Sequence, residues 1–498
     1  MNSRASRHLV WCGWSVLCSL GSRIRLPAVA AAISLAGLMG PAGSADAATI
    51  RVSNCQDSGV GSLRHAVFAA QDGDTIDMRA LTCGTIVFTR RAIRIDQNGL
   101  TIVGPGASKL ALDGNRAGRL FFQPGPGTLS LRSITLRNGR YAAPKARGGC
   151  ISSAGNIDLR DAWIHHCVAF VTSTPGGWPH EASGGGVYSL GSVSLLRSRV
   201  FANSATSNLP EFSSAAGGIS AVGDVTLDQS TVEDNAASTE ASPREGSGGG
   251  ILTNGHLTLY RSRILRNRAH QWGGARSRLG FKATYSSIDS NEGGGIVKSG
   301  GENGPGNDFE LYHSSVSRNL GRGVYAGTGG YNKTVIEDST ISDNVAQQIS
   351  AAIFWGWVDM RNSTIAFNRE EPGAGYGCSA AVYIEVGGTL QSSIVAANSC
   401  SSGPEYDIST GFYEGQNIYG ANNIIGSSVL SVPADTLSVD PRLGPLRDNG
   451  GPTLTHALLS DSPAIDRGNN AAGLGYDQRG IGFPRVKGFQ ADIGAFER

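Results

Sequence analysis

The chain has 498 residues, of which 70 are glycine, 40% are apolar and 16% are charged. This length is too great for one ordinary domain, so we expect several units or an array of repeats. The apolar content excludes a disordered chain, and the glycines, which follow no three-residue period, exclude collagen. What remains is a folded protein rich in turns and β-strands.

The charge excludes one class of partner. The formal net charge is +2, and the first 47 residues contribute four arginines and one aspartate, so the rest of the chain carries −1. A nearly neutral protein lacks the diffuse basic field that non-specific nucleic-acid binding requires. We therefore expect no nucleic acid among its partners.

Residues 1–47 are typical of a secretory signal peptide. An apolar run at 26–40 follows Arg23 and Arg25, and Ala45-Asp46-Ala47 has the small-x-small pattern of a cleavage site. An earlier apolar run at 9–21 leaves an uncleaved anchor or a misassigned start as the alternative. No later stretch has the apolar length of a bilayer span. We expect a secreted or cell-surface protein with no membrane span in the mature chain.

Six cysteines follow the leader, and an even number in an exported chain favours disulfides. They fall into three pairs of near neighbours, Cys55/Cys83, Cys150/Cys167 and Cys378/Cys400, although fifteen connectivities are open. No Cys-x-x-Cys or His-x-x-x-His spacing indicates zinc. We predict structural disulfides and no metal site in these cysteines.

One pattern recurs from about residue 130 to 400. A Gly-rich start leads into a short alternating strand, and the unit closes with Ser-x-(Val/Ile)-x-x-Asn. The closing asparagines recur every 24 to 32 residues, a period that marks stacked repeats. They are Asn203, Asn235, Asn267, Asn291, Asn319, Asn344, Asn368 and Asn398.

Each unit offers three short strands, and no amphipathic helical stretch separates them. The pattern predicts an all-β fold, a right-handed parallel β-helix of about nine or more three-strand coils. Equivalent residues would then lie about 4.8 Å apart, with aliphatic side chains stacked inside and the asparagines in one column. We interpret these asparagines as scaffold, because a stacked amide can bond the next amide and the turn backbone.

The start of the mature chain predicts a cap. Ser62 precedes a short helical stretch with Leu63, Ala66 and Val67 on one face, and Gly73-Asp74-Thr75-Ile76 follows. This segment resembles the N-terminal cap of bacterial surface β-helix proteins. Units such as Val200-Phe201-Ala202-Asn203 resemble the repeats of polymorphic outer-membrane protein passengers.

The end of the chain carries a more specific pattern. It includes Asp440-Pro441-Arg442-Leu443-Gly444-Pro445, Asp448-Asn449-Gly450-Gly451-Pro452, Ser462-Pro463-Ala464-Ile465-Asp466 and Asp492-Ile493-Gly494-Ala495-Phe496-Glu497. This closely resembles the choice-of-anchor Q module of exported bacterial right-handed β-helix proteins with a pectin-lyase-like fold. Its prolines and turn formers predict an irregular cap docked on the last coil.

We divide the chain into a signal peptide at 1–47, an N-terminal cap at 48–84, the β-helix at 85–430 and the C-terminal module at 431–498. Within the module, Asp466, Arg479 and Asp492 form either an acid–base group or, as we prefer, a structural network.

The candidate ligand site lies where the repeat becomes irregular, between about 268 and 333. Cations and aromatic faces gather there, a combination that suits an acidic polysaccharide. The predicted binding residues are Trp272, Arg276, Lys282, Tyr285, Lys298, Tyr312 and Arg322.

Two functions stay open. The first is an extracellular protein that binds polysaccharide or another cell-surface ligand along its long face, as a monomer. The alternative is an acidic-polysaccharide lyase acting by β-elimination, which needs a base near the uronate C5 and a cation for its carboxylate. For that reaction we predict Lys333, Tyr331, His313 and Arg318.

A glycoside hydrolase needs two facing carboxylates, whereas the pairs Glu233-Asp234, Glu337-Asp338 and Glu370-Glu371 are adjacent in strands and point to opposite faces. We therefore prefer the lyase among enzymes. No cofactor is expected, and only the oxygen-rich turn Asn303-Gly304-Pro305-Gly306-Asn307-Asp308 leaves calcium open.

Overall fold

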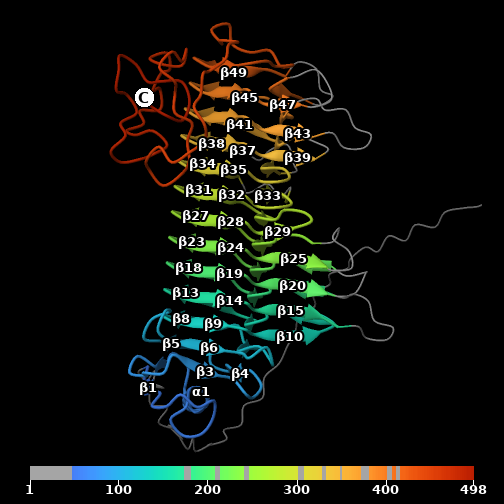
Figure 1. The fold of residues 1–498 in the computed structure, drawn as a ribbon, viewed down its shortest axis with the longest axis vertical. Helices are drawn as coiled ribbons and strands as arrows, with labels where there is room; N and C mark the ends of the chain where they lie inside the picture. The colour runs from blue at the N-terminus through green and yellow to red at the C-terminus, as the bar shows by residue number, and fades with distance from the viewer. Residues whose placement is uncertain are drawn as a thin grey trace, which may run out of the picture. The chain divides into compact units, whose positions relative to one another are not determined.

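The repeat of short strands forms three long parallel sheets, which wind around a common interior (Figure 1). The computed structural model describes residues 47–172, 181–207, 213–239, 246–300, 308–327, 333–347, 350–371, 381–400, 406–410 and 416–498. Residues 47–498 form one compact unit. The predicted signal peptide lies, apart from Ala47, outside the described residues.

We name the three sheets A, B and C. Each coil passes through sheet C, then A, then B, and every pairing between neighbouring strands of these sheets is parallel, as in β13 with β18 and β14 with β19. The 14 strands of sheet A are β1 (Thr49–Arg51), β2 (Thr75–Asp77), β5 (Gly99–Val103), β8 (Thr128–Arg132), β13 (Asn156–Arg160), β18 (Val193–Leu196), β23 (Val225–Asp228), β27 (Leu257–Tyr260), β31 (Phe281–Thr284), β34 (Phe309–Tyr312), β37 (Lys333–Glu337), β41 (Trp357–Arg361), β45 (Gly388–Gln391) and β49 (Ile418–Ala421).

The 13 strands of sheet B are β3 (Thr85–Val87), β6 (Ala111–Asp113), β9 (Thr135–Arg137), β14 (Trp163–His165), β19 (Arg199–Phe201), β24 (Thr231–Glu233), β28 (Arg263–Leu265), β32 (Ser287–Asp289), β35 (Ser315–Ser317), β38 (Thr340–Ser342), β42 (Thr364–Ala366), β46 (Ile394–Ala396) and β50 (Ile424–Ile425). The 12 strands of sheet C are β4 (Ile93–Arg94), β7 (Phe121–Gln123), β12 (Ile151–Ser153), β17 (Val187–Ser189), β22 (Ile219–Ala221), β26 (Ile251–Thr253), β30 (Ala275–Ser277), β33 (Ile296–Lys298), β36 (Val324–Ala326), β40 (Ala352–Phe354), β44 (Val382–Ile384) and β48 (Ile408–Ser409).

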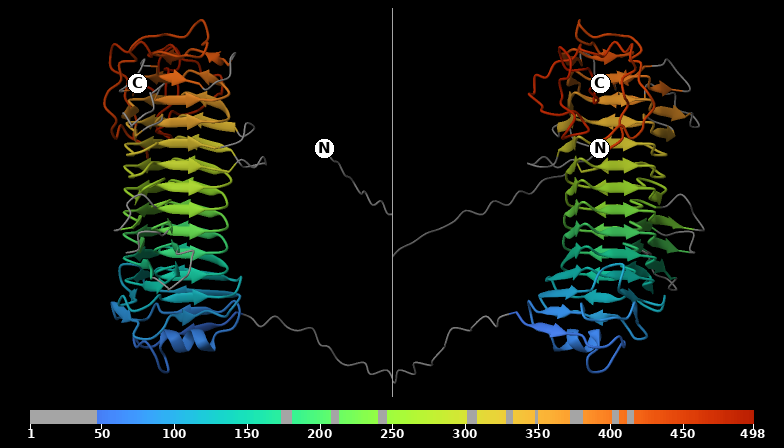
Figure 2. Two further views of the ribbon diagram at one scale, coloured as in Figure 1. Left: turned by 90° about the vertical axis from the view of Figure 1, so that its right-hand side faces the viewer. Right: turned by 60° about the vertical axis from the view of Figure 1, so that its left-hand side comes forward.

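Three small sheets project between sheets B and C (Figure 2). Their strands are β10 (Arg140–Ala143), β15 (Val168–Val171), β20 (Ser204–Ser207), β25 (Ala236–Thr239) and β29 (Arg268–Ala269) in the first, β11 (Lys145–Arg147), β16 (Glu181–Ser183) and β21 (Ser213–Ala215) in the second, and β39 (Val345–Gln347), β43 (Arg369–Glu371) and β47 (Ser399–Cys400) in the third. These side sheets were not predicted from the sequence.

Aliphatic side chains stacked in register make the interior. In sheet B the buried column runs through Ile164, Val200, Val232 and Ile264 in successive coils, and every member is at most 1% exposed. Burial of such side chains is the dominant favourable contribution to folding. The predicted fold class, a parallel β-helix of about nine or more coils, is confirmed.

Two disulfides are as predicted: Cys55–Cys83 and Cys150–Cys167. Cys400 is also disulfide-bonded, whereas Cys378 lies outside the described residues. At the N-terminal end, helix α1 (Leu63–Ala69) covers the first coil, with the Ser62 side chain accepting the His65 N–H at its start. Leu63, Ala66 and Val67 are buried on its inner face.

The C-terminal module is irregular, as predicted, but most of it does not lie on the last coil. Residues 428–437 cover the end of the stack through isolated bridges, such as Ile424 with Leu437. The remainder folds back along the side (Figure 1), where Ala495 N donates to Thr364 Oγ1 and Thr340 Oγ1 donates to Gln478 Oε1. A turn-rich segment does not present the regular backbone donors and acceptors that pair with the last strand of a sheet. The hydroxyl groups on the outer face of sheet B instead give polar groups of the module hydrogen-bond partners.

Within the module, the structure favours the structural network over an acid–base group. Arg479 pairs with Asp477 at 2.6 Å, Asp492 Oδ1 accepts the Asp466 N–H, and Asp466 Oδ1 accepts the Phe489 N–H. These contacts hold the irregular backbone of the module together. No helix in the described part of the chain is long and apolar enough to cross a membrane.

Candidate polysaccharide-binding site

A pocket of about 470 Å³ and a larger one of about 860 Å³ open on the surface of the stack. The larger lies where the first side sheet begins, beneath its edge strand β10 and beside β4 and β7. We name it the arginine pocket. Its charged and aromatic lining consists of Arg91, Arg94, Arg116, Arg119, Arg140, Phe122, Tyr141 and Phe170.

Arg119 is the most buried of these arginines, with 9% of its surface exposed. Its Nη2 donates to the carbonyl of Arg147 at 2.9 Å, while its Nε is buried without a hydrogen-bond partner. The guanidinium carbon lies 3.4 Å from the centre of the Tyr141 ring and 5.5 Å from that of Phe122. Burial lowers the pKa of Arg119 to about 10, so at neutral pH it remains a fixed cation.

The other arginines of the pocket are exposed. Arg140 lies 4.6 Å over the Phe170 ring, and Arg94 pairs with Asp96 at 2.7 Å. Among the residues that the structure describes, Arg91, Arg116 and Arg140 make no ion pair, and no aspartate or glutamate lines the pocket. The positive charges of Arg91, Arg116 and Arg140 are therefore not compensated by an ion pair within the described part of the chain.

These groups suit a particular kind of ligand. A guanidinium binds a carboxylate or a sulfate through two parallel N–H donors, and the aromatic rings offer flat apolar surface for sugar rings. Because the arginines come from three successive coils, they can contact several units of one anionic chain.

The residues predicted as a site from the sequence lie elsewhere and are dispersed. On the outer face of sheet A, Lys282 pairs with Glu310 and Lys333 pairs with Asp359, both at 2.8 Å. Tyr312 lies on the same face, its ring centre 5.0 Å from the Lys282 ammonium.

Two predicted residues meet at the turns between sheets A and B. Tyr285 stacks on His313 with ring centres 4.6 Å apart. His313 is covered by the C-terminal module, and its Nδ1 lies 3.1 Å from the Asp477 carbonyl. Arg318 lies instead at the end of β35 and pairs with Asp289 at 2.7 Å.

The remaining predicted residues lie on or near sheet C. Arg322 lies 5.8 Å over the Trp272 ring, and Arg276 Nε donates to Ser299 Oγ. Lys298 is 1% exposed, and its Nζ donates to the Gly300 carbonyl, so it points into the stack. Tyr331 lies outside the described residues.

The structure therefore does not bring His313, Arg318 and Lys333 to one place, and their role in elimination stays a prediction. The oxygen-rich turn at 303–308 lies outside the described residues except for Asp308, whose Oδ1 accepts the Lys333 N–H. In the part of the chain that is described, no three His, Cys, Asp or Glu side chains gather as metal ligands would.

The arginine pocket was not predicted, because most of its residues lie before about residue 130, where the recognised repeat begins, and the irregular region considered was the one at 268–333. The signal was present: arginines at 91 and 94, at 116 and 119, and at 140 recur at roughly the coil period. Aligning the irregular first coils with the later ones would have placed them together.

No family model and no curated protein matches the chain. A solved structure similar to it is the pectate lyase Pel9A, with 14% sequence identity and a TM-score of 0.35; the match covers 91% of this chain and 98% of that chain.

Proposed function

We propose that this is an exported protein that binds an acidic polysaccharide in the arginine pocket. The observation that carries the proposal is the lining of that pocket: five arginines and three aromatic rings with no carboxylate. The disulfides and the predicted leader support export, because disulfides persist in oxidising compartments. The resemblance of the C-terminal module to choice-of-anchor Q modules supports a bacterial cell surface.

Binding is favoured over elimination by the state of Arg119. Of the residues predicted for elimination, Lys333 and Arg318 are ion-paired and His313 is covered by the C-terminal module, while Tyr331 lies outside the described residues. A base must also be deprotonated to remove a proton. With a pKa of about 10, Arg119 is almost wholly protonated at pH 7. It supplies positive charge there and does not act as a base.

The test is retention of the mature chain on immobilised polysaccharides, with product formation followed in parallel. We expect retention on polygalacturonate or a sulfated glycan and none on neutral glycans such as xylan. Absorbance of unsaturated uronates and reducing ends should stay at the level of the polysaccharide alone. Equal retention on neutral glycans would contradict the proposal, and growth of the absorbance would establish a lyase instead.

A further inference from the structure

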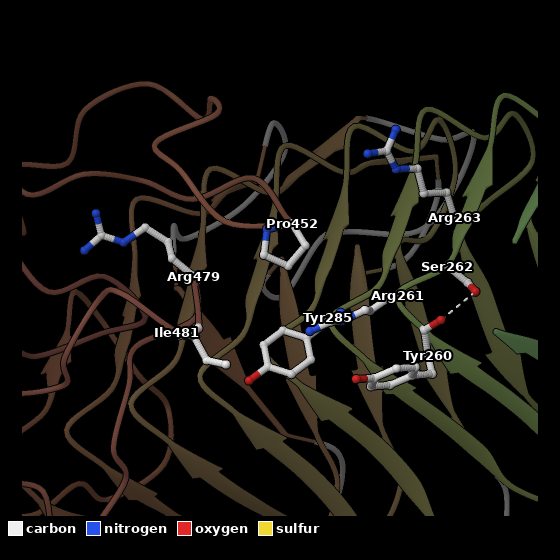
Figure 3. A pocket seen from close by; sticks show the side chains of 9 residues that line it. Tyr260, Arg261, Ser262, Arg263, Tyr285, Pro452, Arg479 and Ile481 are labelled. Atoms are coloured by element: carbon white, nitrogen blue, oxygen red, sulfur yellow. Dashed lines mark hydrogen bonds between the residues drawn. The ribbon is translucent and has the colours of Figure 1, made fainter. Parts of the chain in front are cut away.

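A second pocket lies on another side of the molecule, where the lower edge of the C-terminal module meets the stack. It encloses about 470 Å³. Figure 3 shows Pro452, Arg479 and Ile481 of the module on one side and the turn between β27 and β28 on the other, with Tyr285 between them. We name it the junction pocket.

The position of this pocket follows from the repeat. At each turn from sheet A to sheet B one residue adopts a left-handed conformation, as do Arg197, Gln229, Arg261, Tyr285 and His313. The module covers this row from Tyr285 onward, where Gly480 lies against the Tyr285 ring. The junction pocket therefore begins at the first covered turn.

The stack contributes two uncompensated cations to the pocket. Arg261 and Arg263 are exposed, and within the described residues neither makes an ion pair. The Arg261 guanidinium carbon lies 5.4 Å from the centre of the Tyr260 ring and 5.9 Å from that of Tyr285. No aspartate or glutamate lines the pocket.

The module's own arginine has a different role. Arg479 is 7% exposed, pairs with Asp477 at 2.6 Å and donates to the Glu497 carbonyl, so its charge is already satisfied. The cations that remain for a ligand come from the stack, whereas Pro452 and Ile481 offer apolar contact from the module. A ligand in this pocket would touch both parts at once.

We propose that the junction pocket is a second saccharide site, which takes one anionic sugar unit and holds the module against the stack. The Tyr260 ring, 40% exposed, offers a face to the sugar, and the two arginines bind its carboxylate or sulfate. The proposal rests on the ligand class of the proposed function. The two pockets are four coils apart, about 20 Å along the stack, and therefore bind separately.

The test compares two double variants by calorimetric titration with hexagalacturonate and with a sulfated heparin hexasaccharide. Arg261→Gln with Arg263→Gln removes the junction cations. Arg197→Gln with Arg199→Gln is the matched control, because these residues occupy the same positions two coils earlier, as the register of β19, β24 and β28 shows, and each has an acidic partner. The two probes distinguish a carboxylated from a sulfated ligand.

We expect two sites on the native chain and on the control, and one on the junction variant, with affinity at the lost site at least about tenfold weaker. Ligand should also slow amide exchange at 450–455 and 478–483 in the native chain but not in the junction variant. Both arginines are exposed, so an unchanged melting temperature verifies that the variant is folded.

The failures are distinguishable. A single site that disappears when Arg116 and Arg140 are replaced would overturn the junction pocket and leave the proposed function intact. Binding lost only in the junction variant would support the junction pocket and contradict the arginine pocket. If neither probe binds, both the junction-pocket proposal and the proposed function would be overturned.

Discussion

The asparagine column is the most regular feature at the scale of single residues. Asn291 Oδ1 accepts both the backbone N–H and the side-chain N–H of Asn267, while its own Nδ2 donates to the Ile264 carbonyl and to Asn319 Oδ1. All these asparagines are buried. The column ends at Asp407, whose carboxylate accepts from Asn398. An acceptor-only side chain fits the last position, since no further amide follows.

Replacing Asn291 with alanine should therefore destabilise the fold strongly. The change leaves two N–H groups of Asn267 buried without a partner and removes one donor from the Ile264 carbonyl, which we expect to lower the free energy of unfolding by about 3 kcal/mol. Denaturant unfolding measures the effect. The matched control is Asn156→Ala, an exposed asparagine whose Oδ1 accepts one backbone N–H. Equal losses for both variants would contradict the role given to the column.

A column of serines accompanies the asparagines. Ser262 N donates to Ser286 Oγ, Ser286 N to Ser314 Oγ, and so on at each turn from sheet A to sheet B. The sequence predicts the asparagine column, because strict periodicity reveals which residues stack; the serine of the same motif was not predicted to form a column. Periodicity does not reveal which cations are free: Lys282 and Glu310 are 28 residues apart, yet they are direct neighbours in the register of β31 and β34. Ion pairs between neighbouring coils can be recognised in the sequence only when the coils are aligned correctly.

At the scale of elements, the docking of the C-terminal module depends on buried charges. Asp338, in a turn from sheet A to sheet B, has no exposed surface. Its Oδ1 accepts from Arg485 at 3.1 Å, but its Oδ2 has no hydrogen-bond partner. Burial outweighs the attraction of Arg485 and raises the pKa of Asp338 to about 8. Nearby, burial lowers the pKa of His313 and of His456.

These shifts predict how docking responds to pH. A raised carboxyl pKa means that the docked state binds the proton more tightly, so stability from Asp338 is fully present below its ordinary value of 3.8 and is lost as the pH rises to about 8. The two histidines are largely neutral in both states above about pH 7. From pH 7 to 8 we therefore expect docking to weaken by about 1 kcal/mol.

The pH dependence of the docking free energy is measured by amide exchange over residues 478–498, corrected for intrinsic rates. Asp338→Asn should abolish it whatever the overall stability of the variant, because the amide does not titrate. An identical slope in the variant would show that another group controls docking.

The module also marks the limit of prediction at this scale. Its many prolines and turn formers correctly indicate an irregular element. They do not form a repeat, so they do not predict against which part of the β-helix the module packs. Its side-on position depends on tertiary contacts, such as that of His456 Nε2 with Ser342 Oγ at 2.7 Å, 114 residues away. No local pattern encodes such a contact.

At the scale of the whole molecule, three sheets of 14, 13 and 12 strands make a long regular surface, and two irregular regions beside it create the two pockets. The side sheets begin at the arginine pocket and the module ends at the junction pocket. The repeat predicts the scaffold. The pockets lie where the repeat is interrupted, and this is why periodicity alone does not locate them.

The most direct test of the central claim is the affinity of a double variant of the arginine pocket, Arg116→Gln with Arg140→Gln, for polygalacturonate and heparin at low ionic strength. The control is Arg160→Gln with Arg197→Gln, which removes equal charge from arginines paired with Asp158 and Asp161. We predict binding about a hundredfold weaker in the pocket variant, and within about twofold of the native protein in the control. Equal loss in both, or loss in neither, would contradict binding in this pocket.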